Sequence, residues 1–268
     1  MQERAFAKLN LALHVRERLP DGYHRLETLF AFCEDGDRLT AAEDDDLSLQ
    51  ITGPFATGLG AGPDNLVLRA AQALRDRFGV AQGARLTLDK SLPVAAGLGG
   101  GSADAAAALR LLDRWWKLDA REEDLLGIAS SLGADVPACL PSEPARGEGR
   151  GDLLAPAPDL GLSGTPVLLV NPDVPLSTAA VFGAWDGVDR GPLAGWRDGR
   201  NDLEPAAIAL VPEIAEVLAA LGGAGFARMS GSGATCFGLY RSGAERDAAA
   251  AEIARGHPPW WRLATRLK

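Results

Sequence analysis

The sequence predicts an α+β fold with two domains. Near the N-terminus, hydrophobic and polar residues alternate in a pattern typical of a β-hairpin. Long amphipathic stretches follow, without the regular succession of single strands and single helices that would indicate a doubly wound parallel sheet. Residues 141–151, with two prolines and three glycines, are the best candidate boundary. We therefore predict domains over residues 1–150 and 151–268.

The composition of the 268 residues indicates a globular protein. Hydrophobic residues make up 47% of the chain and charged residues 24%, and the net charge is −9. Such an acidic chain lacks the positive field that nonspecific nucleic-acid binding requires. No apolar run approaches the ~18 residues of a membrane span, and no hydrophobic leader follows the first residues. With three scattered cysteines, these features predict a soluble cytoplasmic protein without a nucleic-acid or membrane partner.

The first predicted element is a strand over residues 5–15. Its apolar residues fall mainly at odd positions, whereas Lys8 and Asn10 lie on the opposite face, which predicts a half-buried strand. The dipeptide Asp21-Gly22 is a preferred hairpin turn, so we expect a return strand over residues 26–33.

The remaining elements follow from hydrophobic periodicity, helix propensity and glycine or proline stops. Asp64 or Asn65 is the expected N-cap of the first helix, and Gly133 is expected to end the third. The other strands are predicted at residues 47–51, 85–90, 167–170, 234–240 and 261–267, and the helices at 66–78, 103–117, 122–132, 214–221 and 244–254.

The strongest functional feature is a glycine-rich segment between a strand and the Ala-rich helix 103–117. Glycines let the backbone approach a ligand and adopt positive φ, so that successive N–H groups can surround an anion. The N-terminus of the helix adds unsatisfied N–H groups and the positive end of its dipole. We therefore predict a phosphate-binding loop rather than a linker. Its residues are Pro93, Val94, Ala95, Ala96, Gly97, Leu98, Gly99, Gly100, Gly101 and Ser102.

Three well-known glycine motifs do not match this loop. A P-loop requires a lysine after the glycines, and none follows them here. A dinucleotide fingerprint requires Gly or Ala where Ser102 stands. A nucleophile elbow requires a glycine where Asp104 stands.

Other segments are candidates for the same site. Residues 229–233 form a second glycine cluster, either a turn or another wall of the anion site. Lys8 is one of only four lysines, and it is either a solvated strand residue or a point charge for a phosphate or a reacting hydroxyl. Asp135, within Gly133–Pro137, is either a turn residue or a general base fixed by a short rigid loop.

Together these pieces resemble the GHMP small-molecule kinases. That family has a phosphate loop of the form Pro-x-x-x-Gly-Leu-Gly-Ser-Ser-Ala, and residues 93–103 match it with an extra glycine. The chain departs from the family pattern at two places, Ala95-Ala96 in the loop and Ala138-Cys139 after the segment Gly133–Pro137. The segments similar to the family's other motifs, in the family's order, are Ala7-Lys8-Leu9-Asn10-Leu11, Asp21-Gly22-Tyr23-His24, Gly133-Ala134-Asp135-Val136-Pro137, Asn201-Asp202-Leu203-Glu204 and Met229-Ser230-Gly231-Ser232-Gly233.

The resemblance implies a two-domain α+β kinase with its active site in the cleft between the domains. It implies ATP as phosphoryl donor and Mg²⁺ as the metal. Because the longer glycine loop is similar to that of one family member, it also implies a small-molecule acceptor, a cytidine-diphosphate-linked polyol of isoprenoid biosynthesis. Asp135 would be the catalytic base and Lys8 its electrostatic partner. The further implied site residues are Asn65, Lys90 and the loop residues Ala96–Ser102 for ATP, and Asn10, Tyr23, His24, Asp135 and Phe182 for the acceptor.

Ser102 is the candidate residue on the metal side. A serine that opens a helix beside phosphates can reach Mg²⁺, but it can equally serve as a plain N-cap.

Two alternatives to this function remain open. One is a kinase for another small alcohol, such as homoserine or mevalonate, and the other is an inactive nucleotide-binding protein. Tyr23, His24 and Phe182 favour an acceptor that carries a nucleobase, because a base needs aromatic and hydrogen-bonding walls. An inactive protein would have lost Asp135, Lys8 or the phosphate loop, and all three are present.

Overall fold

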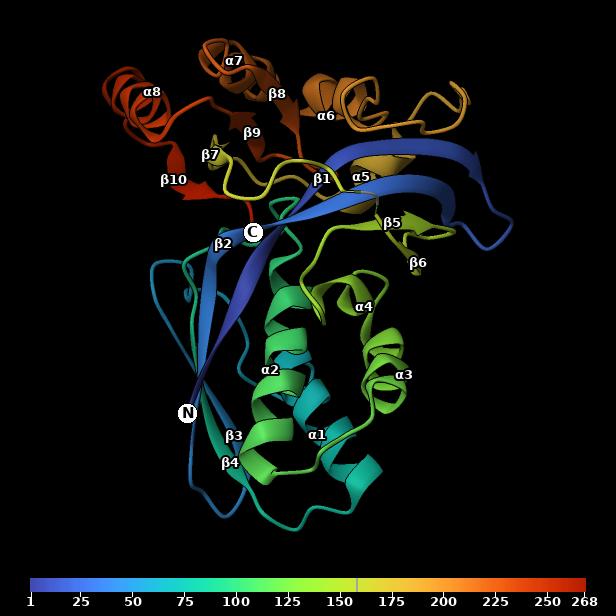
Figure 1. The fold of residues 1–268 in the computed structure, drawn as a ribbon, viewed down its shortest axis with the longest axis vertical. Helices are drawn as coiled ribbons and strands as arrows, with labels where there is room; N and C mark the ends of the chain where they lie inside the picture. Colours follow the sequence, from blue (N-terminus) through green and yellow to red (C-terminus); the bar gives the residue numbers. More distant parts are fainter. Residues whose placement is uncertain (158) are drawn as a thin grey trace. The chain divides into compact units, whose positions relative to one another are not determined.

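The computed structural model describes residues 1–157 and 159–268, and its fold is α+β, as predicted (Figure 1). The chain divides into two compact units. Unit 1 comprises residues 1–7, 35–94 and 99–142, and unit 2 comprises residues 8–34, 95–98 and 143–268. Each unit is thus assembled from separate stretches, and the two long strands β1 (Gln2–Arg18) and β2 (His24–Ala42) contribute to both.

Unit 1 combines a small sheet with packed helices. The C-terminal part of β2 pairs antiparallel with β4, and β4 pairs in parallel with β3. Helix α1 packs against α2 and α3, and α2 also contacts α4. Besides its parts of β1 and β2, the unit contains β3 (Leu47–Thr52), α1 (Leu66–Phe78), β4 (Ala84–Asp89), α2 (Gly100–Trp116), α3 (Glu122–Leu132) and α4 (Val136–Cys139).

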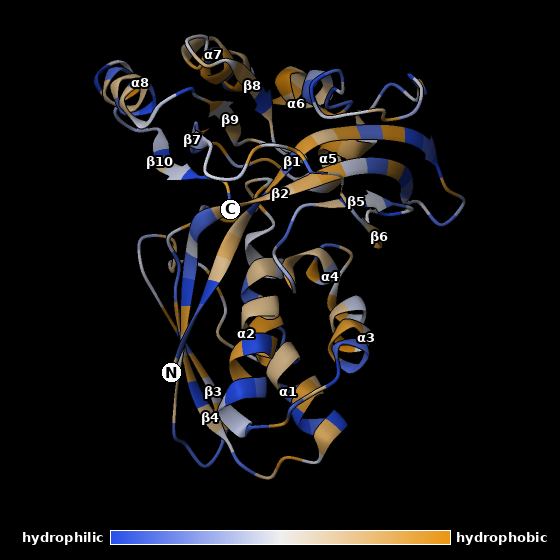
Figure 2. Ribbon diagram, viewed as in Figure 1, coloured by the Kyte–Doolittle hydropathy of each residue, from blue (hydrophilic) through white to orange (hydrophobic). Residues whose placement is uncertain are grey.

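Small residues allow the two longest helices of unit 1 to approach each other. Helix α2 buries a run of alanines from Ala105 to Ala108, and α1 buries Ala70 and Ala71. Figure 2 shows apolar and polar segments alternating along α1 and α2, as expected for helices with one buried face.

Unit 2 is built around an antiparallel sheet in the order β10-β7-β9-β8. Helices α7 and α8 both contact β7, and the N-terminal part of β2 pairs with β5, which pairs with β6. Besides its parts of β1 and β2, the unit contains β5 (Ala145–Glu148), β6 (Leu153–Pro156), β7 (Pro166–Asn171), α5 (Thr178–Gly183), α6 (Glu204–Leu210), α7 (Glu213–Ala220), β8 (Phe226–Met229), β9 (Cys236–Leu239), α8 (Gly243–Gly256) and β10 (Trp261–Arg266).

A hydrophobic core joins distant segments of unit 2. Leu13 and Val15 of β1 lie in one cluster with Leu168 and Val170 of β7 and with Val217 of α7. The N-terminal hairpin is therefore part of the same core as the C-terminal sheet. Burial of this apolar surface is the main driving force for folding the unit.

Most predicted elements are present at nearly the predicted positions. The helix over residues 122–132 ends before Gly133, and Asn65 caps α1 by accepting a hydrogen bond from the Val67 amide at 2.9 Å. The prediction that residues 5–15 form a half-buried strand is wrong, because Lys8, Asn10 and His14 on the polar face are also buried. Hydrogen bonds inside unit 2 compensate that burial.

Other boundaries differ from the predictions. Helix α2 begins at Gly100 rather than Ala103, with Gly99 as its N-cap at φ 62°, and β2 continues to Ala42 rather than ending at residue 33. Several elements were missed, namely α4, α5, α6, β5, β6 and β8. They are four to seven residues long, too short for a hydrophobic period to be recognisable.

The compact units do not follow a single cut in the sequence. One change between units falls after Ser142, inside the candidate boundary of residues 141–151, but that stretch also contains β5. The division into residues 1–150 and 151–268 stays a prediction. No helix among the described residues has both the length and the apolarity to cross a membrane.

Candidate active site

In the glycine-rich loop every second residue from Ala95 to Gly99 has a left-handed backbone conformation, and the loop leads directly into α2. Ala95, Gly97 and Gly99 have φ of 52°, 76° and 62°. Successive N–H groups of a chain in such alternating conformations point toward a common centre and bind anions. Helix α2 follows with its unsatisfied N-terminal amides. The phosphate-binding role of the loop stays a prediction.

The second glycine cluster packs against this loop within unit 2. The Ser230 hydroxyl donates a hydrogen bond to the Gly97 carbonyl at 2.9 Å and accepts one from the Asn10 amide at 3.1 Å. The Thr235 amide donates to the Ala96 carbonyl at 3.2 Å. A Cβ on Gly97 would lie only 2.2 Å from the Ser230 carbonyl oxygen, so the two segments approach as closely as glycine permits. The predicted neighbourhood of the two loops is therefore observed.

Residues of the Asn201–Glu204 motif hold the second loop in place. The Asn201 amide nitrogen donates to the carbonyls of Met229 and Gly231 at 2.9 and 2.8 Å. A Glu204 carboxylate oxygen accepts a hydrogen bond from the Met229 amide at 3.0 Å. This motif thus supports the loop through its backbone.

Lys8 is held in a chain of polar side chains on β1 and β2. Its ammonium donates to the Asn10 side-chain oxygen at 3.0 Å, and Asn10 in turn donates to the Thr28 hydroxyl at 2.8 Å. The ammonium also lies 4.8 Å from the centroid of the Phe30 ring. With only 3% of its surface exposed, Lys8 is a buried, oriented cation, and the solvated-residue alternative is wrong.

Asp135 is the N-cap residue of α4, directly after α3 and two linking residues. Pro137 lies in the first turn of α4, and the Val136 amide donates to the Gly133 carbonyl at 3.2 Å. The carboxylate is half-buried on a short turn whose backbone is fixed by these contacts. Asp135 belongs to unit 1 and Lys8 to unit 2, so their action on one hydroxyl stays a prediction.

Lys90, predicted to contact ATP, forms a buried ionic cluster with two carboxylates. Its ammonium donates to Asp37 at 2.5 Å and to Asp104 at 2.6 Å. Asp37 also accepts from the amides of Ser91 and Leu92, the residues that precede the phosphate loop. Burial, outweighing the attraction of Lys90, raises the pKa of Asp104 to about 7. No local sequence pattern indicates this cluster, because Asp37 and Asp104 lie within strand and helix patterns.

Two further predicted ATP-side residues have clear local positions. The Asn65 side chain caps α1 and donates to the Gly60 carbonyl at 2.9 Å, so its amide fixes the loop before the helix. Ser102 lies in the first turn of α2, and the plain N-cap alternative is wrong, because Gly99 occupies that position. Among the described residues, no group of three or more His, Cys, Asp or Glu side chains is placed to hold a metal ion.

The predicted acceptor residues include a pair of packed rings. The His24 imidazole lies 4.9 Å from the Phe182 ring centroid, with their planes tilted by 35°. Burial, together with the charge of Arg18, lowers the pKa of His24 below its ordinary value, so the imidazole is neutral at neutral pH. A neutral imidazole has one donor and one acceptor nitrogen, which suits the hydrogen-bonding edge of a pyrimidine.

Tyr23 extends from the hairpin turn and is 56% exposed. The Arg150 guanidinium lies 4.0 Å from the centroid of its ring, and Arg150 is also paired with Asp21 at 2.5 Å. Arg150 was not predicted, and nothing in its local sequence distinguishes it from other surface arginines. It covers the tyrosine ring by a cation–π contact.

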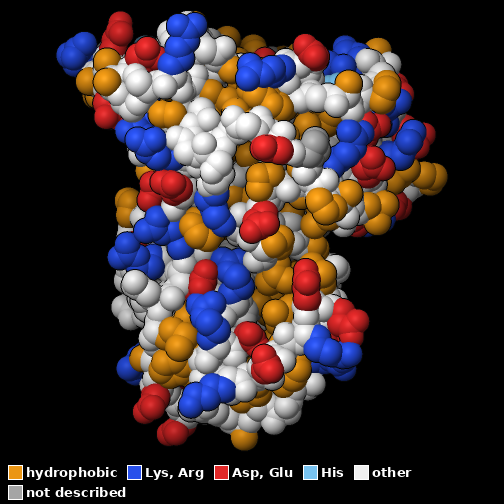
Figure 3. Space-filling view, in the orientation of Figure 1, with side chains coloured by type: hydrophobic (Ala, Val, Ile, Leu, Met, Phe, Trp, Pro, Cys, Tyr) orange, Lys and Arg blue, Asp and Glu red, His pale blue; other side chains and the backbone are white. Residues whose placement is uncertain are grey.

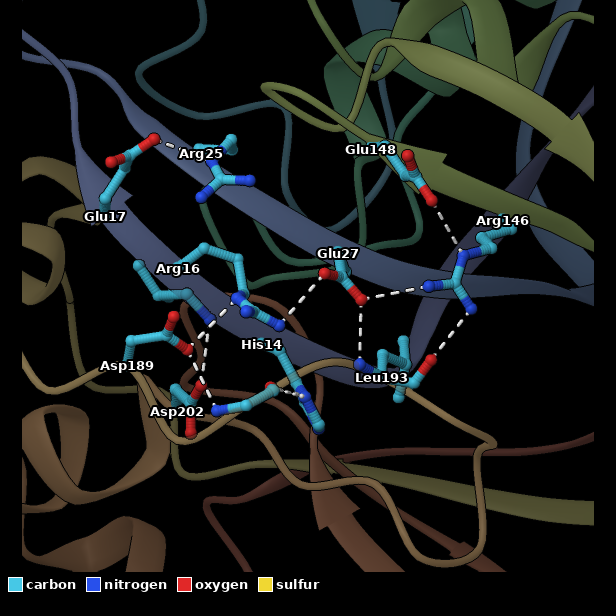
Figure 4. Close-up of polar contacts among 12 residues, drawn as sticks. His14, Arg16, Glu17, Arg25, Glu27, Arg146, Glu148, Asp189, Leu193 and Asp202 are labelled. Atoms are coloured by element: carbon cyan, nitrogen blue, oxygen red, sulfur yellow. Dashed lines mark hydrogen bonds and ion pairs between the residues drawn. The ribbon is translucent and has the colours of Figure 1, made fainter.

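A polar network fastens the segment between Phe182 and Asn201 to the hairpin (Figure 4). Glu27 accepts hydrogen bonds from Arg16 at 3.1 Å, Arg146 at 2.9 Å and the Leu193 amide at 2.7 Å. His14 contacts the Gly191 carbonyl through Nδ1 at 3.0 Å and accepts the Arg200 amide at Nε2 at 3.2 Å. An imidazole that accepts at Nε2 carries its proton on Nδ1, so this geometry requires neutral His14.

The geometry around His14 predicts a loss of stability in mild acid. Burial lowers the pKa of His14 below its ordinary value of 6.5. Because the folded-state pKa lies below the unfolded-state value, the contribution of neutral His14 is complete above about pH 6.5 and is lost as the pH falls toward the folded-state pKa. Urea unfolding at about pH 7.5 and about pH 5.5 should show a smaller loss for His14→Gln than for the wild type. Equal losses for His14→Gln and wild type would contradict the prediction.

Comparison with known proteins places the chain in a family. The model of the GHMP kinase N-terminal domain matches residues 65–143, and that of the C-terminal domain matches residues 186–258. A relative from Rhizorhabdus wittichii is 55% identical, over 99% of this chain and 94% of its own. One from Paracoccus denitrificans is 51% identical, over 99% of this chain and 96% of its own.

Solved structures agree with the sequence comparisons. A crystal structure of 4-(cytidine 5'-diphospho)-2C-methyl-D-erythritol kinase has a TM-score of 0.84 and 34% identity, covering 100% of this chain and 99% of the other. A mevalonate kinase structure with a TM-score of 0.71 and 9% identity, covering 100% of this chain and 99% of the other, shares the fold alone.

The chain therefore belongs to the GHMP kinase family, and it is an ATP-dependent kinase of a small-molecule substrate. The two relatives described above are both 4-diphosphocytidyl-2-C-methyl-D-erythritol kinases, and the chain is a member of that group within the family.

Proposed function

We propose that the chain transfers the γ-phosphoryl group of ATP to the 2-hydroxyl of 4-diphosphocytidyl-2-C-methyl-D-erythritol, giving the 2-phosphate, in the non-mevalonate route of isoprenoid biosynthesis. The observation that carries the choice of acceptor is the packed pair of His24 and Phe182. A neutral imidazole beside an aromatic ring offers both hydrogen bonds and stacking to a nucleobase. The relatives' names support the same acceptor.

The donor side of the reaction rests on the glycine loops. The backbone amides of residues 95–99 and the N-terminus of α2 are proposed to bind the ATP phosphates. The net charge of −9 would repel ATP, and on the face shown in Figure 3 basic and acidic side chains are interspersed. Local donors therefore have to provide the binding.

The transfer step needs one proton acceptor and one cation near the reacting oxygen. As the new bond forms between the acceptor oxygen and the γ-phosphorus, the bond from that phosphorus to the bridging oxygen breaks, and ADP leaves. Asp135 is proposed to take the hydroxyl proton, and Lys8 to stabilise the negative charge on the oxygen. The Lys8–Asn10–Thr28 chain fixes the ammonium for this role.

Mg²⁺ belongs to the proposal as the metal that accompanies ATP. Mg²⁺ prefers oxygen ligands and is often bound through substrate phosphates with few protein groups. Ser102, half-buried in the first turn of α2, offers a hydroxyl oxygen of that kind. When bound, the ion neutralises the charge of the phosphates.

A cytoplasmic location is also part of the proposal. The reaction consumes ATP, and the scattered, odd-numbered cysteines suit a reducing compartment.

The test is a comparison of acceptors under identical conditions with saturating ATP. We expect phosphorylation of the cytidyl acceptor, and much lower kcat/KM for 2-C-methyl-D-erythritol 4-phosphate, homoserine and mevalonate. The remote cytidine group orients the reacting hydroxyl, so truncated acceptors should lose kcat as well as affinity. If a nucleotide-free alcohol proves the better acceptor, the proposed substrate is wrong. If phosphate is transferred to none of the four acceptors, the inactive nucleotide-binding alternative is favoured.

A further inference from the structure

Trp185 lies against the proposed base-binding pair, and no family motif marks it. It follows α5 by two residues. Its ring centroid lies 5.7 Å from that of His24, and the two planes meet at 84°, an edge-on contact. His24 therefore has aromatic neighbours at two different angles, Phe182 and Trp185. Both of these rings pack against the hydrophobic core of unit 2, which anchors them.

The two buried histidines of the hairpin are oriented in different ways. His14 is fixed by hydrogen bonds at both ring nitrogens. His24, by contrast, is 9% exposed and is contacted by the rings of Phe182 and Trp185. Two rings that meet the imidazole at different angles restrict the orientation of its plane.

The indole of Trp185 carries a polar group that burial leaves without a partner in the described part of the chain. Its Nε1 is buried, and no hydrogen-bond partner for it is present among the described residues. A buried donor without a partner destabilises the folded state, whereas a phenylalanine or leucine would carry no such donor. The large flat ring at this position contacts both the core of unit 2 and the imidazole of His24.

We propose that Trp185 is a positioning residue for the acceptor, holding the His24 imidazole in the orientation in which it hydrogen-bonds the nucleobase. This inference rests on the proposed function. Phe182 stacks on the base itself, whereas Trp185 acts through His24. Replacement of the indole frees the imidazole to rotate, and the loss of orientation appears in acceptor binding and turnover, with ATP binding unaffected.

The test uses steady-state kinetics of Trp185→Leu and Trp185→Phe. We expect Trp185→Leu to lower kcat/KM for the cytidyl acceptor by roughly 10-fold, with KM for ATP within about twofold of wild type. Trp185→Phe keeps an edge-on ring without the N–H and should recover most of the loss. Trp260→Phe is the matched control, because Trp260 stacks on His257 at 3.7 Å in a second histidine–tryptophan pair of unit 2. It should show wild-type kinetics.

A double-mutant cycle separates positioning from general packing. If Trp185 acts through His24, Trp185→Leu should cause little further loss when His24 is already alanine. An additive loss in the double variant, an unchanged kcat/KM in Trp185→Leu, or an equal rise of KM for ATP would overturn the proposal.

A second measurement does not depend on the identity of the acceptor. The chain has three histidines, so the imidazole ¹H–¹⁵N signals of His24 can be assigned by comparison with His24→Ala. In the ligand-free protein these signals should shift or broaden in Trp185→Leu but not in Trp260→Phe. Unchanged His24 signals would overturn the positioning role even if the cytidyl acceptor is confirmed. Failure of the wild type to use that acceptor would overturn the proposed function, while the spectra still report on the contact.

Discussion

Asp135→Asn is expected to reduce kcat by roughly 10²–10⁴, the usual contribution of general acid–base catalysis, and to leave ATP affinity nearly unchanged. Asparagine keeps the shape of the side chain but cannot accept the hydroxyl proton. The fold should persist, because the turn at Asp135 is fixed by Pro137 and by backbone hydrogen bonds, and asparagine preserves both. Single-turnover phosphorylation and ATP titration measure the two quantities separately.

The matched control for this variant is Asp76→Asn. Asp76 is an exposed carboxylate of unit 1 on α1, hydrogen-bonded to Gln72. It should retain wild-type turnover. Turnover near the wild-type level in Asp135→Asn would remove Asp135 from the role of base.

Gly97→Ala is expected to weaken ATP binding by roughly 10- to 100-fold, since small displacements of binding groups have large effects. Gly97 has φ of 76°, where side chains other than hydrogen are strained, and its added Cβ would lie 2.2 Å from the Ser230 carbonyl oxygen. One of the two glycine segments must therefore move. Calorimetric titration with ATP measures the affinity.

The control for the loop variant is Gly127→Ala in α3, where an added Cβ meets no atom within 4 Å. It should bind ATP like the wild type and be at least as stable, because alanine favours a helix more than glycine does. Unchanged ATP affinity in folded Gly97→Ala would show that residues 95–99 do not bind the phosphates.

The sequence pattern predicted the position of the phosphate loop but not the conformation of each glycine in it. Gly97 and Gly99 have positive φ, whereas Gly100 and Gly101 are already part of α2. Helix propensity placed the helix start at Ala103, because glycines are poor helix formers. Packing of α2 against α1 extends the helix into them. Tertiary contacts therefore determine which glycines adopt positive φ in the loop and which are part of the helix.

Side chains that work in pairs were the least predictable part. Lys8, His24 and Phe182 stand at positions that the family resemblance identifies, whereas the residues that contact them do not. The cluster of Lys90 with Asp37 and Asp104 joins residues that are 53 and 14 positions away from the lysine. Contacts over such distances follow from the fold and leave no local pattern in the sequence. Trp185 was missed for the same reason.

The interleaved construction of unit 2 bears on any attempt to study the C-terminal half in isolation. Residues 8–34 and 95–98 belong to this unit together with residues 143–268, and Leu13 and Val15 lie in its core. A polypeptide beginning near residue 151 would lack β5 and the whole hairpin that pairs with it. It would leave apolar side chains of β7 and α7 without their partners and an unpaired strand edge available for aggregation. Any truncation of this chain therefore has to keep three separate stretches together, residues 8–34, 95–98 and 143–268, because they form one folding unit.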